Sequence, residues 1–171
     1  SDISLLDGLL HLVSFDSDTP GHDGLATLSP LSKTRFDLTY DLTEEDSFAG
    51  SISSFDDFGT LAKESTDLTG VSLVFGLRDP GSPGLLLQLE DASGKKDQVL
   101  LTGIDDTERF WMVDTALFDD LDLTQVTVIV FLLVEDNLAD TTSTLQVRLG
   151  NQSFIPSLAP DATLTEADTS H

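Results

Sequence analysis

Short apolar runs recur along the chain, and their spacing predicts strands rather than helices. The longest unbroken run is residues 128–134, Val-Ile-Val-Phe-Leu-Leu-Val. Seven apolar residues are too few to span a bilayer, and such a run is typical of a strand buried on both faces. Residues 110–113 precede it as a second candidate strand and contain the only tryptophan. The two are joined by an acidic turn at residues 119–122.

Alternation of apolar and polar residues predicts further half-buried strands. In residues 35–42, Phe36, Leu38 and Tyr40 share one side, with acidic residues and threonine on the other. The other candidates are residues 47–54, 71–77, 85–89, 98–102, 126–134 and 145–149. Gly50, inside one of them, predicts a bulge or a close approach of another backbone. Residues 25–34 have no clear period and are expected to be irregular.

The beginning of the chain allows two interpretations. Asp7-Gly8 between leucine-rich flanks suits a tight hairpin turn, whereas residues 4–13 could form a short amphipathic helix. The second half of residues 1–16 favours a strand. We expect one domain over residues 1–158, with residues 1–13 as a possible arm or extra strand. Residues 159–171 would form a polar tail.

About nine or ten short, regularly spaced strands without a long helix predict an all-β protein, an antiparallel β-sandwich of the jelly-roll type. The tripeptide Asp-Leu-Thr occurs at residues 37, 41, 67 and 122. Asp and Thr side chains bond nearby backbone groups, so the recurring tripeptide indicates turns rather than a repeat architecture.

Charge limits the possible partners. The chain has 31 acidic and 8 basic residues, for a net charge of −23. Nucleic acids and anionic membranes bind through Lys and Arg, so such a surface would repel both. No apolar stretch approaches the ~18 residues needed to cross a bilayer. The three histidines lie in unrelated contexts without a nucleophile motif, so we expect no enzyme.

A metal site is the other chemistry that this acidity allows. The chain has no cysteine, which excludes thiolate sites. Asp16, Asp18 and Asp23 form the best candidate, because a spacing of one residue lets two carboxylates converge and neighbouring glycines permit a tight loop. The pattern departs from an EF-hand, since Pro20 takes the third ligand position. We expect a structural Ca²⁺ as the possible cofactor.

Four segments of the chain carry a family resemblance. They are Asp-Leu-Thr-Gly-Val-Ser-Leu-Val-Phe from residue 67, Leu-Leu-Leu-Gln-Leu-Glu-Asp-Ala-Ser-Gly from 85, Phe-Trp-Met-Val from 110 and Leu-Phe-Asp-Asp-Leu-Asp-Leu-Thr-Gln-Val-Thr-Val-Ile-Val-Phe from 117. Together they resemble bacterial β-jelly-roll carbohydrate-binding modules with the galactose-binding-like fold. The similarity covers about residues 35–150. In that family a late strand carries an Asp that helps to hold calcium, whereas Arg148 stands at the matching place. We expect Arg148 to pair with a carboxylate, with Asp16 as the first candidate.

The resemblance implies a sugar-binding face with exposed aromatic rings. Trp111 could form such a platform, or it could pack in the core as the family's Trp usually does. Tyr40 is a weaker candidate because it lies on the apolar side of its strand. Gln88, Glu90 and Arg78 could line a concave face and bond sugar hydroxyls. These five residues are the predicted ligand contacts.

Two functions from different classes follow. The first is a non-catalytic, secreted or cell-surface module that binds polysaccharide. The alternative is a structural subunit of a filament, surface layer or matrix, which would assemble with other copies of itself by strand exchange. The leucine-rich residues 1–13 and the scarcity of exposed aromatics favour the alternative.

Overall fold

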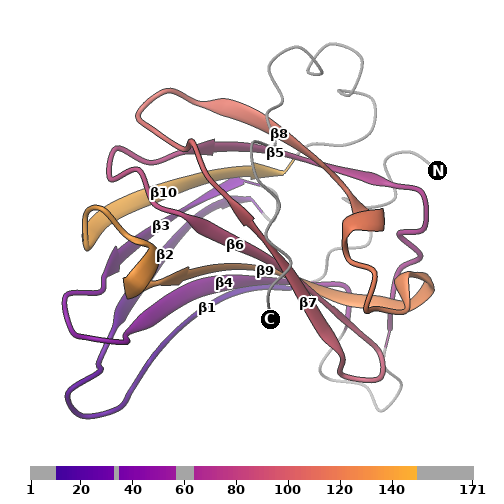
Figure 1. Cartoon of the computed structure of the whole chain (residues 1–171), viewed down its shortest axis with the longest axis horizontal. Helices are drawn as coiled ribbons and strands as arrows, with labels where there is room; N and C mark the ends of the chain where they lie inside the picture. The colour runs from indigo at the N-terminus through magenta and orange to yellow at the C-terminus, as the bar shows by residue number, and fades with distance from the viewer. Residues whose placement is uncertain (1–10, 33–34, 57–63, 150–171) are drawn as a thin grey trace.

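The protein folds into two antiparallel sheets of five strands each, packed face to face (Figure 1). This computed structural model describes residues 11–32, 35–56 and 64–149. Sheet A has the strand order β1-β4-β9-β6-β7, and sheet B has the order β2-β3-β10-β5-β8. The prediction of an all-β antiparallel sandwich is therefore confirmed.

Nine of the ten strands in the described residues match a predicted segment, and β2 does not. Their bounds are β1 His11–Asp16, β2 Leu25–Ser32, β3 Arg35–Asp41, β4 Phe48–Ser54, β5 Ser72–Arg78, β6 Leu85–Asp91, β7 Lys96–Leu101, β8 Arg109–Asp114, β9 Val126–Val134 and β10 Thr142–Leu149. Three short 3₁₀ turns interrupt the connections, namely η1 Thr115–Leu117, η2 Leu123–Gln125 and η3 Glu135–Asn137. None of the described helices is long and apolar enough to cross a membrane.

The long apolar run forms β9, the central strand of sheet A, between β4 and β6. Its side chains alternate between two environments. Ile129, Phe131 and Leu133 enter the main core, whereas Val128 and Val130 are buried outside the core cluster. Alternation places these two valines on the outer face of the sheet. As expected for this strand, residues that point to either face are buried over most of its length.

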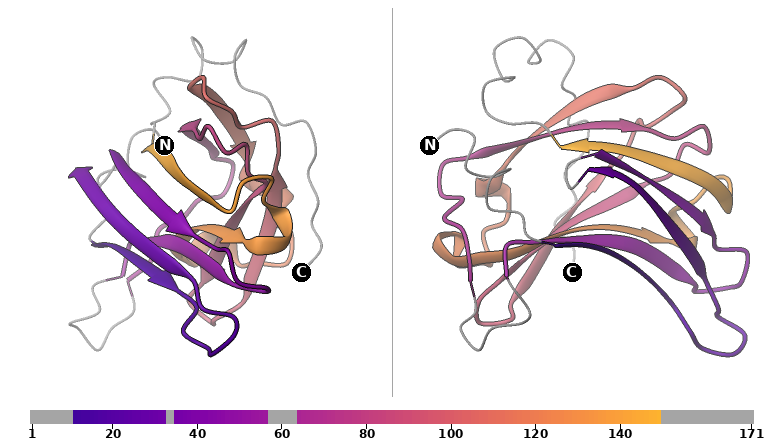
Figure 2. Two further views of the ribbon diagram at one scale, coloured as in Figure 1. Left: turned by 90° about the vertical axis from the view of Figure 1, so that its left-hand side faces the viewer. Right: turned by 180° about the vertical axis from the view of Figure 1, so that it is seen from behind.

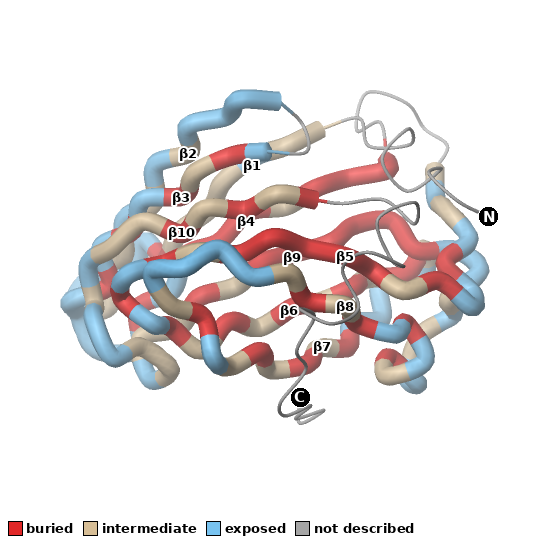
Figure 3. The backbone as a smooth tube through the Cα atoms, turned by 90° about the horizontal axis from the view of Figure 1, so that it is seen from above, coloured by how far each residue is buried: buried red, intermediate tan, exposed pale blue. Residues whose placement is uncertain are grey.

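Aromatic contacts join the two sheets across the core. Phe131 of β9 meets Phe75 of β5 edge to face, with ring centroids 5.2 Å apart. The ring centroid of Phe36 on β3 lies 6.4 Å from that of Phe131. Such edge-to-face pairs add to the burial of their apolar area. Figure 3 shows the buried centre of the sandwich and the exposed strand β2 at its edge.

Strand β2 is a correction, because residues 25–34 were expected to be irregular. Its inward residues are only Ala26 and Leu28, while Leu25, Thr27 and the proline at position 30 are exposed. The strand lies at the edge of sheet B, where proline is tolerated because its missing N–H costs no ladder hydrogen bond. A weak alternation of apolar residues is therefore enough to form a strand at this edge.

The Asp-Leu-Thr tripeptides form the expected turns at three of their four positions. Asp41, Asp67 and Asp122 each accept a hydrogen bond from the backbone N–H two residues later. This bond is the first cause that lowers the pKa of Asp67. The copy at Asp37 lies inside β3 instead.

The N-terminal alternatives fall partly outside the described residues. Residues 11–16 form β1, as expected for the second half of the segment. Residues 1–10, the remainder of the possible arm, lie outside the described part. The same holds for residues 150–171, which include the predicted domain end and tail, so these boundaries stay predictions.

Candidate ligand-binding groove

The strands of sheet A are curved, with their middles nearer to sheet B than their ends (Figure 2). The outer face of this sheet is therefore concave. Cross-strand pairing sets the side chains on this face in rows. One row runs Val13, Ile52, Val130, Gln88 and Gln98 from β1 to β7. The face is therefore apolar over β1, β4 and β9 and turns polar over β6 and β7.

A groove of about 480 Å³ lies on this face. Its lining residues come from all five strands and are Phe15, Phe48, Ile52, Gln88, Glu90, Lys96, Val128, Val130, Leu132 and Val134. A smaller hollow of about 330 Å³ shares Gln88 and Lys96 with it and extends over β7. The site thus has an aromatic side, an aliphatic floor and a polar side.

Two phenylalanines form the aromatic side. Phe15 on β1 and Phe48 on β4 have ring centroids 6.2 Å apart and an interplanar angle of 50°. Phe48 is 39% exposed. The Phe15 ring lies over Gly50, its direct cross-strand partner, where an added Cβ would meet Cζ of Phe15 at 2.6 Å. The close approach predicted at Gly50 is confirmed, and it is an approach of an aromatic ring as well as of the β9 backbone.

The polar side is built by cross-strand pairs of β6 and β7. Gln88 lies opposite Gln98, and Glu90 lies opposite Lys96. The Lys96 ammonium is 3.7 Å from the Glu90 carboxylate, and its side chain is 60% exposed. These groups can donate and accept hydrogen bonds at the border of an apolar floor, which is the usual composition of a small-ligand site.

Of the predicted ligand contacts, only Gln88 and Glu90 line the groove. Trp111 lies on β8 of sheet B, is 1% exposed and belongs to the hydrophobic core. Tyr40 is also 1% exposed, and its hydroxyl donates to the carboxylate of Asp79 at 2.7 Å. Burial, and then this carboxylate, raise the pKa of Tyr40. Neither ring has a free face for a sugar, which corrects the prediction that they bind a ligand.

Arg78 lies on β5 of sheet B, away from the groove. Its guanidinium binds Asp106 at 2.7 Å. It therefore takes part in a surface ion pair, and its predicted place beside Gln88 and Glu90 is wrong.

Sequence reasoning missed Phe15 and Phe48, which are not among the predicted ligand contacts. A signal was present at Gly50, because a glycine within a strand often marks a place where another group approaches closely. Phe48 is two residues from this glycine and therefore lies on the same face of β4.

The predicted metal residues are not brought together. Asp16 accepts a hydrogen bond from the Ala26 N–H at 2.9 Å, and Asp18 and Asp23 are exposed. Among the described residues, one group of three carboxylates has its ligand atoms within 4.8 Å of one another, and it contains none of the three. The structure therefore gives no support for a metal at Asp16, Asp18 and Asp23, and this assignment stays a prediction.

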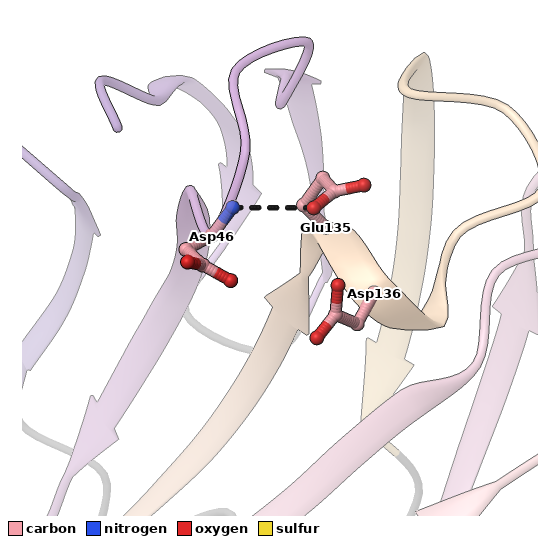
Figure 4. Close-up of side chains that lie close together, drawn as sticks. All are labelled: Asp46, Glu135 and Asp136. Carbon is pink, nitrogen blue, oxygen red and sulfur yellow. Dashed lines mark hydrogen bonds between the residues drawn. The ribbon is translucent and has the colours of Figure 1, made fainter. Parts of the chain in front are cut away.

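The group that could hold a metal ion consists of Asp46, Glu135 and Asp136 (Figure 4). It joins the turn before β4 to η3 after β9, and the Asp46 N–H donates to Glu135 at 3.2 Å. Sequence reasoning missed it, because Asp46 is separated by 89 residues from Glu135, the nearer of the other two.

Arg148 pairs with Glu108 rather than with Asp16. Its Nε lies 3.6 Å from the Glu108 carboxylate, and the two side chains are 40% and 36% exposed. The expectation of a carboxylate partner is confirmed, but the partner was wrong. So exposed a pair contributes little to stability.

No family model matches the chain, and no curated protein matches its sequence. The solved structures do show similar folds. The family 11 carbohydrate-binding module of cellulase Lic26A-Cel5E from Clostridium thermocellum aligns with a TM-score of 0.57 and 13% identity, over 85% of this chain and 88% of the module. A family 11 module of the same organism, in complex with a β-1,3-1,4-mixed-linked tetrasaccharide, gives a TM-score of 0.55 at 13% identity, over 85% and 89% of the two chains. The agarase AgWH50C gives 0.56 at 12% identity, over 81% of this chain and 24% of the enzyme.

The chain has the fold of these modules. The resemblance to β-jelly-roll carbohydrate-binding modules is therefore confirmed at the level of fold. At 13% identity this similarity does not assign a ligand, which has to be argued from the groove.

Proposed function

We propose that the chain is a non-catalytic, extracellular carbohydrate-binding module whose ligand lies in the groove of sheet A. The observation that carries the proposal is the pair Phe15 and Phe48 on a concave face that is bordered by Gln88 and Glu90. The shared fold with carbohydrate-binding modules supports it.

The chemistry of the groove suits a sugar polymer. Aromatic rings offer an apolar face to the C–H groups of a pyranose, and Phe48 has a wet ring available for this contact. Amide and carboxylate groups on the other side can bond hydroxyls. The groove is lined by residues from all five strands of the sheet, which fits a ligand that lies across the sheet, such as a polysaccharide, better than a compact metabolite.

The test is binding to a panel of soluble polysaccharides by affinity electrophoresis, with Phe48→Ala as the probe. Phe110→Ala is the matched control, because Phe110 is a partly exposed phenylalanine on β8 of sheet B. Loss of a stacking ring should weaken binding about tenfold or more, whereas the control should bind like the unmodified protein. Equal binding by Phe48→Ala and the unmodified protein would place the ligand elsewhere.

Calcium forms a secondary part of the proposal. Carboxylate oxygens are hard ligands that Ca²⁺ prefers, and Asp46, Glu135 and Asp136 supply several of them. Binding to the native state alone raises the melting temperature by linkage. Ca²⁺ should do so beyond matched NaCl, and Glu135→Gln, but not Asp18→Ala, should remove the difference. Equal stabilisation by the two salts contradicts the calcium assignment.

Self-assembly is kept as a second candidate because β1 is an edge strand of sheet A. An edge strand can accept a strand from another chain. Residues 11–13, which belong to the predicted arm, pair with β4 of their own chain. Polymers that disappear when residues 1–10 are deleted would support assembly, and a chain that stays monomeric at high concentration would exclude it.

A further inference from the structure

The floor of the groove is aliphatic. It consists of Ile52 on β4 and of Val128, Val130, Leu132 and Val134 on β9. None of these side chains can donate or accept a hydrogen bond. A sugar hydroxyl pressed against them would lose water without gaining a partner, which is unfavourable. The C–H groups of a pyranose can lie on this floor, but a ligand that also carries apolar substituents would bury more apolar area there.

The polar side lies immediately beside that floor. Strand pairing sets Gln88 next to Val130 and Glu90 next to Val128, one strand spacing of roughly 4.8 Å away. A ligand in the groove thus meets apolar and hydrogen-bonding groups in parallel strips. It is matched by a polymer that carries apolar substituents along one side and free hydroxyls along the other.

The charge of the groove narrows the class of ligand further. Glu90 and Lys96 are the charged residues of the groove lining, and they pair with each other. The groove is therefore close to neutral, although the chain carries a net charge of −23. Polymers with sulfate or carboxylate groups would be repelled by the surrounding field without gaining an unpaired cation in the site. A neutral ligand is the electrostatic match.

We propose that the ligand is a neutral polysaccharide that carries acyl ester groups, of which O-acetyl is the simplest. The acyl methyl groups lie on the aliphatic floor, while free hydroxyls bond Gln88 and Glu90. This inference rests on the proposed carbohydrate-binding function and specifies the ligand class for the same groove.

The experiment compares two ligands that differ only in acylation. Acetylated glucomannan oligosaccharides are titrated into the full chain by calorimetry, beside the same oligosaccharides after mild alkaline deacetylation. Burial of one methyl group strengthens binding about fourfold, so two buried acetyl groups should give on the order of tenfold tighter binding. Deacetylation removes only neutral groups, so it leaves the electrostatic term unchanged.

A pair of variants locates the effect. Ile52→Thr puts a hydroxyl on the floor and keeps a β-branched side chain, and it should reduce the preference for the acetylated ligand by about threefold or more. Val13→Thr is the matched control, because Val13 is the cross-strand partner of Ile52 on the same face but is 43% exposed and outside the groove lining. It should leave the preference unchanged.

The outcomes separate this inference from the proposed function. Equal affinity for the two ligands, or binding only to unacetylated glycans of the panel, overturns the acyl inference and leaves carbohydrate binding intact. Absence of binding to every glycan overturns both. An acetyl preference that survives in Ile52→Thr unchanged also contradicts the assignment to this floor.

Discussion

A glycine in the middle of each sheet gives a comparison that tests the packing of the groove. Gly50 on β4 and Gly76 on β5 are each the direct cross-strand partner of a phenylalanine, Phe15 and Phe110 respectively. The neighbours of an added methyl group differ. At Gly50 it would meet the Phe131 carbonyl oxygen of β9 at 2.3 Å, whereas at Gly76 it would meet Cε1 of Phe110 at 2.8 Å.

We predict that Gly50→Ala destabilises the protein and Gly76→Ala does not. Ordinary contact begins at 3.4 Å, so the β9 backbone would have to move by 3.4 − 2.3 = 1.1 Å, which two paired strands resist. Overpacking of this kind costs about 1–3 kcal/mol. A side chain can turn away at Gly76, and the alanine stabilises through the unfolded state by about 0.4–1 kcal/mol. The net change there should lie near zero.

Urea and thermal unfolding, both followed by circular dichroism, measure the free energy of unfolding and the melting temperature of the two variants. For a domain of this size, Gly50→Ala should lower the melting temperature by roughly 3–10 °C. It should also weaken glycan binding, because the Phe15 ring cannot remain over the new methyl group. Equal stability of Gly50→Ala and the unmodified protein, or a larger loss in Gly76→Ala, would refute the packing described for this groove.

Two further predictions concern residues outside the groove. Burial raises the pKa of Asp91, but the stronger sum of hydrogen bonds from Ser93, Asp122 and Lys95 lowers it, so its folded pKa lies below the unfolded value. The contribution of Asp91 to the stability of the fold is therefore present above pH ~4, and it is lost as the pH falls through the folded pKa. Asp91→Asn should cost about 1–3 kcal/mol at pH 7 and flatten the acid side of the stability profile; an unchanged profile contradicts this. Trp111→Ala should cost about 3–5 kcal/mol because the ring is buried, and a fully stable variant would show that the ring is not core.

The sequence predicted the strands well where the apolar signal was strong or alternating. β9 was evident from seven apolar residues in a row, and β3 from the alternation around Leu38. β2 was missed because only two residues of this edge strand, Ala26 and Leu28, point inward, so its sequence shows little apolar alternation. A strand can be predicted from the local sequence only when enough of its side chains are buried to produce an apolar pattern.

The site was predicted less well, for a reason visible in β8. Alternation requires one of Phe110 and Trp111 to point outward, and the sequence does not say which. The structure turns Phe110 outward over Gly76 and buries Trp111. The outward ring lies opposite a residue that is 34 positions away in the chain, and such a partner is not visible in the local sequence. The pairing of Phe15 with Gly50 and the cluster around Glu135 join residues that are at least as far apart in the chain.

The central claim is that a glycan binds on the outer face of sheet A. Its most direct test is a titration followed by isoleucine methyl NMR. Ile52 lines the groove, whereas Ile104 and Ile129 are 2% and 0% exposed in the core and serve as internal controls. Binding should shift the Ile52 methyl signals with saturation and leave the two core signals in place. Saturable binding that leaves Ile52 unchanged would contradict the account.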